Sequence, residues 1–297
     1  MAQFPRRDYS GPPRRNRVSA DAPNTAQQRS RPAAKSSAAP AAETAWENQA
    51  YWYDQLQGQG GADLYQQVLL PAVLKRLGAK KGQRVLDIGC GQGVLGRALA
   101  HLGVASLGVD ASPTLIATAQ ARAGANEKHL LGDARKLGEA LGAERFDHAA
   151  AVMVLQDMSP IDAVLAGAAA VIQPGGRLVM ALTHPCFRQP KRTSWGWDDD
   201  QRQQYRRIDG YLSPYQMRIA THPGAARGTA EGDMETLSSH RPLSAYIDAC
   251  GAVGLGITGC DELTNPRRGT KGSRYAAEDL AAREIPLFLV LTATKLR

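Results

Sequence analysis

The sequence predicts an α/β fold built on a parallel sheet. The first observation is that short apolar runs alternate with helix-like segments from Gly82 onward, a pattern typical of βαβ units. The second is a glycine-rich turn that links the first of these runs to the helix after it. With 297 residues, of which 43% are hydrophobic and 22% charged, the chain is long enough to bury a core of this kind.

The elements are predicted in order from the spacing of apolar residues. Apolar side chains recur at helical spacing over residues 64–77, which predicts a helix before the sheet. Strands are expected at residues 84–88, 105–109, 129–131, 147–152 and 177–182. The helices between them are expected to start near residues 93, 112, 134 and 160. A further helix is expected at 242–252, with strands at 256–260 and 286–293.

The formal net charge of +8 is concentrated at one end of the chain. Residues 1–42 carry eight Lys or Arg against two acids, and the rest of the chain carries 28 against 26. The tail is rich in Ala, Pro, Ser and Arg, so it cannot bury enough apolar surface to fold, and we expect it to be disordered. The near-neutral remainder gives no indication of a nucleic-acid surface.

Composition also limits where the protein is expected to act. No run approaches ~20 apolar residues, so no membrane span is expected, and no apolar h-region marks a secretory signal. The four cysteines form no CxxC pair and no zinc spacing. They are expected to be reduced thiols of a cytoplasmic protein, and no metal site is expected.

The most informative segment is RVLDIGCGQGVLG at residues 84–96. Its glycines allow positive φ and a close approach of a ligand to the backbone, at a helix N-terminus that can receive an anion. Dehydrogenases share such a turn. Asp87, two residues before Gly89, would repel a pyrophosphate over the turn and would suit a ligand with an ammonium group.

Two further acids follow the next two strands. Asp110 stands where a carboxylate can accept both hydroxyls of a ribose. Asp133 could accept from an adenine amino group, or it could be a helix N-cap. Three acids at three consecutive strand ends fit a ligand that has an amine, a ribose and an adenine.

These segments resemble the class I S-adenosylmethionine-dependent methyltransferases, and most of all the small-molecule enzymes of the ubiquinone and menaquinone type. The matching segments are VLDIGCGQG (85–93), GVDASPTLI (108–116), LLGDARKL (130–137), FDHAAAVMVLQDM (146–158) and VIQPGGRLVMALTHPCF (171–187). HPCF (184–187) and HRPLS (240–244) strengthen the match. The resemblance implies a Rossmann-like, doubly wound, seven-stranded sheet over residues 43–297, mostly parallel with an antiparallel last strand.

The resemblance implies S-adenosylmethionine as cofactor and suggests which residues bind it. Gly89, Cys90 and Gly91 are expected at its methionine moiety, with Asp87 near the ammonium. The other expected contacts are Asp110, Ala111 and Ser112 at the ribose, Asp133 and Ala134 at the adenine, and the carbonyl of Val152 at the ammonium. Tyr65 and residues 51–53 could cover the methionine end, although core packing is an equal alternative for Tyr65.

Methyl transfer requires in-line alignment, and a base only if the acceptor must lose a proton. His184, at the end of the fifth strand, is the first candidate, and Asp157, after the fourth strand, is the second. His240 is a weaker candidate. Each has a structural alternative: a loop hydrogen bond for His184, a cap of the helix near Pro160 for Asp157, and a brace for His240.

Residues 185–240 interrupt the alternation after the fifth strand and hold six of the seventeen aromatic residues. We expect a lid over a small-molecule acceptor that is aromatic or apolar. The alternative is that these aromatics form a small core of their own. The basic residues Arg188, Lys191, Arg192, Arg206 and Arg207 could bind an acidic acceptor or be solvated.

Three other functions compete with small-molecule methyl transfer. The first is a nucleic-acid or protein methyltransferase that uses the basic tail, although VMVLQD (152–157) does not fit the motif of base-amine enzymes. The second is a module that binds S-adenosylmethionine without catalysis. The third is an NAD-dependent dehydrogenase. Nucleic acid is not expected as a partner, and the sequence does not indicate an oligomeric state.

Overall fold

The computed structural model describes residue 44 and residues 46–220, 235–266 and 271–296. The tail at 1–42, predicted to be disordered, lies outside the described residues. Residues 221–234 of the insertion lie outside them too.

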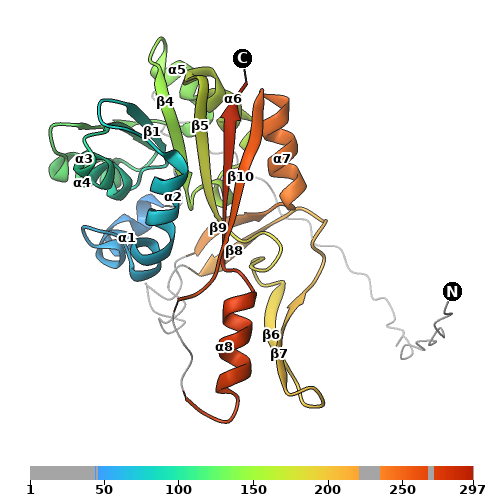
Figure 1. Cartoon of the computed structure of the whole chain (residues 1–297). Coiled ribbons are helices and arrows are strands. Elements are labelled where there is room, and N and C mark those ends of the chain that lie inside the picture. The colour runs from blue at the N-terminus through green and yellow to red at the C-terminus, as the bar shows by residue number, and fades with distance from the viewer. Residues whose placement is uncertain (1–43, 45, 221–234, 267–270, 297) are drawn as a thin grey trace, which may run out of the picture. The chain divides into compact units, whose positions relative to one another are not determined.

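The described residues form one seven-stranded sheet in the order β10-β11-β5-β4-β1-β2-β3. Its strands are β1 (Arg84–Ile88), β2 (Ala105–Asp110), β3 (Glu127–Leu131), β4 (Phe146–Val152), β5 (Ile172–Thr183), β10 (Leu255–Leu263) and β11 (Phe288–Lys295). β1 pairs in parallel with β2 and β4, and β4 pairs in parallel with β5. β11 alone runs antiparallel, against both β5 and β10 (Figure 1). The predicted mostly parallel sheet with an antiparallel last strand is confirmed.

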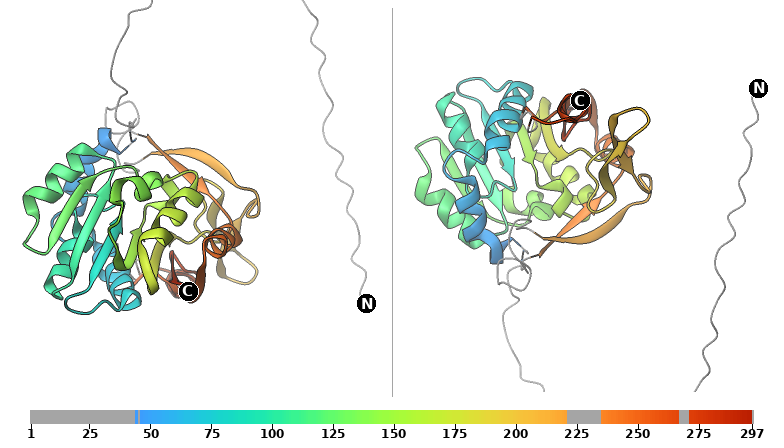
Figure 2. Two further views of the ribbon diagram at one scale, coloured as in Figure 1. Left: turned by 90° about the horizontal axis from the view of Figure 1, so that it is seen from above. Right: turned by 90° about the horizontal axis from the view of Figure 1, so that it is seen from below.

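Helices cover both faces of the sheet (Figure 2). Leu86 and Ile88 of β1 belong to the core beneath one layer, while Val85 belongs to the core beneath the other, because side chains alternate along a strand. The first layer is α5 (Leu137–Leu141), α6 (Ile161–Val171) and α7 (Leu243–Ala252). The second contains α2 (Leu70–Leu77) and α3 (Val94–His101). By its position in β1, Asp87 faces this second layer.

α4 (Pro113–Arg122) follows β2, and several short helices lie before the sheet or between its strands. Before the sheet lie η1 (Glu47–Gln49), α1 (Ala50–Gln57) and η2 (Tyr65–Leu69), a π-helical turn that leads into α2. η3 (Ala134–Lys136) follows β3, and η4 (Leu155–Asp157) follows β4.

The insertion after β5 folds into two hairpins that the sequence did not predict. They are β6 (Thr193–Asp198) with β7 (Gln203–Ile208), and β8 (Tyr215–Ala220) with β9 (Glu235–His240). In these strands an aromatic ring is paired with an arginine and not with an apolar side chain, so the usual apolar pattern of a strand is hidden. Arg206, for example, lies 5.0 Å from the ring centre of Trp195. Trp195 and Tyr205 are 39% and 48% exposed, so these two rings do not belong to a core, whereas Tyr211 and Tyr215 both pack against His240.

A second element that the sequence did not predict is α8 (Tyr275–Glu284), which lies beside β6 and β7 (Figure 1). Arg274, the residue before it, stacks on Trp197 at 4.4 Å. Four of the ten residues of α8 are charged and four are alanine, so few large apolar side chains are left to give the periodic signal from which a helix is predicted.

Candidate functional site

The glycine turn after β1 has the geometry that its sequence predicts. Gly89, Gly91 and Gly93 have φ values of +68°, +53° and +86°, which favour glycine. A Cβ on Gly89 would collide with Val154, and one on Gly91 would lie 3.3 Å from the Tyr53 ring. The turn therefore lies directly beneath the loop after β4 and beneath α1.

Asp110, at the end of β2, fixes the same turn from the other side. Its Oδ2 accepts from the backbone N–H of Gly91 and its Oδ1 from that of Ser112, each at 2.9 Å. Burial raises the pKa of Asp110, against these hydrogen bonds. Each carboxylate oxygen can accept a second hydrogen bond, so the group can still receive two ribose hydroxyls. Ala111 and Ser112 follow it, and Ser112 caps α4 by accepting from Leu115 N.

Asp87 is the second buried acid of the site. Its side chain is 3% exposed, and no described residue donates a hydrogen bond to it. Burial and then the nearby Asp110 raise its pKa to about 7. A buried carboxylate without a donor fits a cationic ligand group, because an ammonium would satisfy it and hold it in the charged form.

The raised pKa of Asp87 predicts a pH-dependent loss of stability. Because the folded state holds this proton more tightly than the unfolded state, stability falls as the pH rises from the ordinary aspartate pKa through about 7. Without ligand, wild type should lose about 2 kcal/mol more between pH ~5 and ~8 than Asp87→Asn does. Urea titrations at the two pH values measure this. Equal losses in the two proteins would show that Asp87 titrates normally.

The remaining predicted cofactor residues differ in how they are placed. Asp133 caps η3 and forms a bidentate ion pair with Arg135, which lowers the pKa of Asp133, so the N-cap alternative is observed. The thiol of Cys90 lies 3.9 Å from His129 Nδ1 and packs on Gly108, which leaves its backbone for a ligand. Ala134 and Val152 are buried.

The tyrosines near the chain start separate into two groups. Tyr51 is 77% exposed, so its expected role over the methionine end is not supported. Tyr53 lies over the glycine turn. Burial, and then Asp110, Asp87 and Asp157, raise the pKa of Tyr53, so three carboxyl groups act on this phenol. Burial and then Asp87 raise the pKa of Tyr65, which also packs against the α2 core.

The segment before α1 also contacts the site, and the sequence did not predict this. Trp46 donates a side-chain hydrogen bond to Asp157 and packs edge-on against Tyr53, with ring centres 5.4 Å apart. Glu47 accepts from the hydroxyls of Ser112 and Thr114, the latter at 2.5 Å. These contacts connect the start of α1 to the loops after β2 and β4.

The structure does not support His184 as the base. Its side chain is 1% exposed, its Nδ1 accepts from the Cys186 N–H at 3.2 Å, and its Nε2 lies 2.9 Å from Glu262 Oε1. The proton is therefore on Nε2 and is donated to Glu262. Burial lowers the pKa of His184, although Glu262 opposes this. Both ring nitrogens are engaged, and the hydrogen bond to Cys186 holds the loop after β5. This is the loop hydrogen bond considered above as the alternative role of His184.

Asp157 lies in η4 and does not cap a helix. α6 begins after Pro160 without a side-chain cap, so the structural alternative for this residue is wrong. Burial raises the pKa of Asp157 to about 7, against the hydrogen bond from Trp46. A carboxyl group with a pKa near neutrality can take a proton at physiological pH.

The remaining polar candidates lie in the insertion. His240 is a brace, since its Nε2 is 2.7 Å from the carbonyl of Tyr211 and its ring packs against Tyr215. Arg206 binds the carbonyl of Phe187, and Arg192 stacks on Tyr215. Arg207 pairs with Asp209. Arg188 donates no side-chain hydrogen bond to a described residue.

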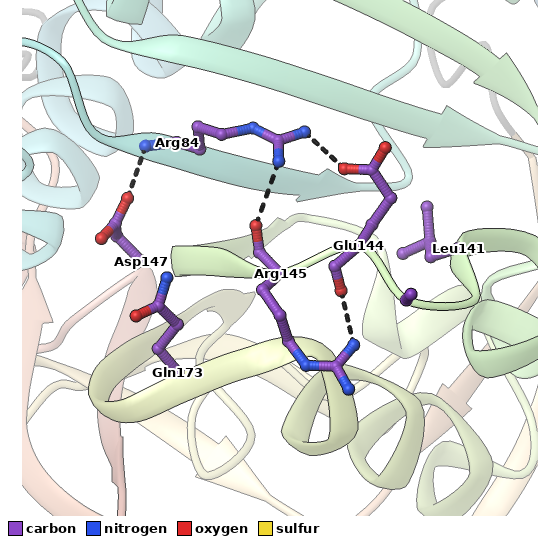
Figure 3. A pocket seen from close by; sticks show the side chains of 7 residues that line it. Arg84, Leu141, Glu144, Arg145, Asp147 and Gln173 are labelled. Atoms are coloured by element: carbon purple, nitrogen blue, oxygen red, sulfur yellow. Dashed lines mark hydrogen bonds and ion pairs between the residues drawn. The ribbon is translucent and has the colours of Figure 1, made fainter.

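A hollow of about 550 Å³ lies at the opposite, amino edge of the sheet. Figure 3 shows that its charged groups contact one another. Arg84 donates from its backbone to Asp147 at 2.7 Å and from its guanidinium to Glu144 at 2.6 Å. Ligands of α/β sheets bind at the carboxyl edge, where the glycine turn and the acids lie, so this hollow is not the candidate site.

Two negative findings apply to the described part of the chain. Within residues 46–220, 235–266 and 271–296, no group of three His, Cys, Asp or Glu side chains could hold a metal ion. In the same residues no helix has the length and apolar character that crossing a bilayer requires.

A Rossmann-like sheet with a buried acid near the end of β1 and another at the end of β2 is typical of domains that bind an adenosine cofactor, and the buried Asp87 suits a cationic group of such a ligand. Comparison with known proteins makes this specific: residues 86–180 match the family model described as a methyltransferase domain. The chain is also similar to a crystal structure of an S-adenosylmethionine-dependent methyltransferase from Mesorhizobium loti. The two share 25% identity with a TM-score of 0.58, over 76% of this chain and 96% of that one.

Curated relatives match over the same region. The ubiquinone biosynthesis O-methyltransferase of Rhodopseudomonas palustris (strain BisB18) is 38% identical over 109 residues, which are 36% of this chain and 42% of that protein. The chain thus spans less than half the length of the curated relatives it matches. A putative S-adenosylmethionine-dependent methyltransferase from Listeria monocytogenes shares the fold, with 18% identity and a TM-score of 0.57 over 77% of this chain and 97% of that one.

The family match, the curated relatives and the Mesorhizobium loti structure together support a class I S-adenosylmethionine-dependent methyltransferase. S-adenosylmethionine is the cofactor of this class, and the buried, donor-free carboxylate of Asp87 fits its ammonium group. The NAD-dependent dehydrogenase alternative is therefore set aside.

Proposed function

We propose that this protein transfers the methyl group of S-adenosylmethionine to a small-molecule acceptor, with Asp157 as base. The observation that carries the proposal is that Tyr53, which lies over the glycine turn and packs against Trp46, is within electrostatic reach of Asp157, Asp87 and Asp110. Two of these acids suit the cofactor, and the third is a carboxyl group with a pKa of about 7. The name of the Rhodopseudomonas palustris relative supports a hydroxyl oxygen as the atom that receives the methyl group.

In the proposed mechanism the protein mainly aligns and desolvates the reactants. The cofactor supplies a methyl group bonded to a positively charged sulfur. Asp110 holds the ribose hydroxyls, and Asp87 faces the ammonium. Asp157 accepts the acceptor's proton on a carboxylate oxygen while the hydrogen bond from the Trp46 N–H holds the carboxyl group in place. Tyr53 and Trp46 exclude water from above the glycine turn.

The proposal also covers the domain boundaries and the compartment of the protein. We place the methyltransferase domain at residues 43–297, with residues 185–240 as the lid over the acceptor. The four cysteines, all among the described residues, are free, which supports a reducing compartment and hence the cytoplasm.

Binding and transfer can be tested separately with wild-type protein. Calorimetry should detect binding of both S-adenosylmethionine and S-adenosylhomocysteine. Incubation with methyl-labelled cofactor and a small-molecule cell extract should give a labelled product heavier by one CH₂. Binding without any product would support the non-catalytic module, and label in added nucleic acid or protein would support the macromolecular alternative. Failure to bind either compound would refute the proposal.

Arg188 is the residue that we propose holds an anionic group of the acceptor. It borders a small hollow between the end of β5, β9 and α7, which Gln156 also lines. The Gln156 Oε1 is buried and has no partner among the described residues. The Arg188 side chain is exposed, and partial desolvation of its guanidinium lowers its pKa. The guanidinium has no hydrogen-bond partner among the described residues, so an available cation lines the same hollow as the free Gln156 Oε1. A ligand that has both an anionic group and an O–H or N–H would satisfy the two.

Arg188→Gln is therefore expected to lower labelled transfer at limiting acceptor by about tenfold or more. The labelled product should bind an anion-exchange resin. Arg207→Gln, which removes an arginine already paired with Asp209, is the matched control and should leave transfer unchanged. An unretained product, or equal rates in the two variants, would exclude this role.

A further inference from the structure

Arg241 bridges the insertion and the loop that carries Asp157. It lies between the end of β9 and the start of α7, in the HRPLS run. Its Nη1 donates to the carbonyl of Leu155 at 3.2 Å, and its Nη2 donates to the carbonyl of Met158 at 2.6 Å. These two carbonyls stand on either side of Asp157 in the sequence. One planar guanidinium therefore spans the whole of η4.

Few contacts within η4 fix its shape. It is a single turn of three residues without a side-chain N-cap, and it follows Met153, a non-glycine residue with a φ of +58°. Inside the turn, Asp157 N donates to the Val154 carbonyl at 2.9 Å. Such a short turn is not stable by itself, so its geometry depends on donors from elsewhere in the fold.

The surroundings of Asp157 show what Arg241 maintains. Trp46, the residue before η1, donates to the carboxyl group, and Asp157 acts on the phenols of Tyr53 in α1 and Tyr246 in α7. Tyr246 is buried and its hydroxyl forms a hydrogen bond with Arg241. Both guanidinium hydrogen bonds of Arg241 to this loop go to backbone carbonyls, so Arg241 acts on the backbone around the carboxyl group.

We propose that Arg241 is a positioning residue that clamps η4 and so keeps the Asp157 carboxyl group enclosed against Trp46. This clamp couples the β9–α7 junction to the reacting end of the site. The inference rests on the role of Asp157 in the proposed function. A lysine could not replace the arginine fully, because one ammonium cannot reach two carbonyls with the geometry of a planar fork.

The indole of Trp46 gives a readout that does not depend on the acceptor. With four tryptophans in the chain, a proton–nitrogen correlation spectrum of labelled protein has few indole signals, and Trp46→Phe identifies the one to follow. That signal should move with a midpoint near pH 7 in wild type, because the indole donates to Asp157. In Arg241→Gln the midpoint should fall by about one unit or more as the carboxyl group becomes hydrated, and in Arg241→Lys it should fall by less.

Arg177→Gln is the matched control. Arg177 also donates from its guanidinium to two backbone carbonyls, those of Arg76 and Leu77 at 3.1 and 3.3 Å, but it pairs with the start of β4, whereas η4 follows the end of that strand. In Arg177→Gln the pH midpoint of the Trp46 indole signal should equal that of wild type. Calorimetric binding of S-adenosylhomocysteine shows that each variant is folded.

Two negative results have different meanings. A wild-type midpoint near 7 that stays unchanged in folded Arg241→Gln would overturn the clamp and leave Asp157 as base. A Trp46 signal that does not titrate near pH 7 in wild type would overturn both the clamp and the role of Asp157, even if the cofactor binds.

Discussion

Asp110→Ala should weaken binding of S-adenosylmethionine by about 100-fold or more. The carboxylate is expected to accept two ribose hydroxyls, and each charge-assisted hydrogen bond contributes about 1.5–3 kcal/mol. The same oxygens hold the N–H groups of Gly91 and Ser112, so their loss also loosens the glycine turn. Isothermal titration with S-adenosylmethionine and S-adenosylhomocysteine measures both affinities.

The control for this prediction is Glu144→Gln. Glu144 is also an acid that accepts hydrogen bonds, but it pairs with Arg84 in the hollow at the amino edge of the sheet (Figure 3). The affinity of Glu144→Gln for the cofactor should equal that of wild type. If Asp110→Ala retains native circular dichroism and binds as tightly as wild type, the ribose does not lie at Asp110.

The parts of this fold that sequence predicts are those in which a residue pattern is a local consequence of structure. Apolar runs are visible because the parallel strands are buried on both faces, and the glycine turn is visible because its φ values favour glycine. Asp87 and Asp110 could be selected because each stands at or near the end of a recognisable strand. Local sequence thus carries the cofactor half of the site.

The other half depends on contacts that are distant in the chain. Trp46 reaches Asp157 across more than a hundred residues, and nothing near either residue indicates the hydrogen bond. The partners of His184 were hidden from the sequence for a similar reason. Its near-neutral reference pKa made it the first candidate, but Glu262, from another strand, occupies its Nε2. The alternation of the inserted strands is hidden because arginines stack on their aromatic residues.

The two candidate bases therefore differ in one physical respect, which is whether a proton-accepting atom is free. Both nitrogens of His184 are engaged, whereas Asp157 receives its one side-chain hydrogen bond from Trp46 and keeps further lone pairs for a proton. Asp157→Asn should accordingly lower the rate of methyl transfer by about 10²–10⁴-fold while cofactor affinity stays within about threefold of wild type. The amide oxygen of Asn can still accept from Trp46, so the variant tests the charge and not the packing.

The pH profile provides the second test of Asp157. Because the base must be unprotonated, the wild-type rate should rise as the pH increases through about 7 and level off above it. In Asp157→Asn this rise should disappear. Asp162→Asn, an exposed acid in the first turn of α6, is the matched control and should keep both the rate and the profile. If Asp157→Asn retains more than about a tenth of the wild-type rate with the same profile, the acceptor loses its proton to another group, because general-base catalysis of ordinary strength would have been lost.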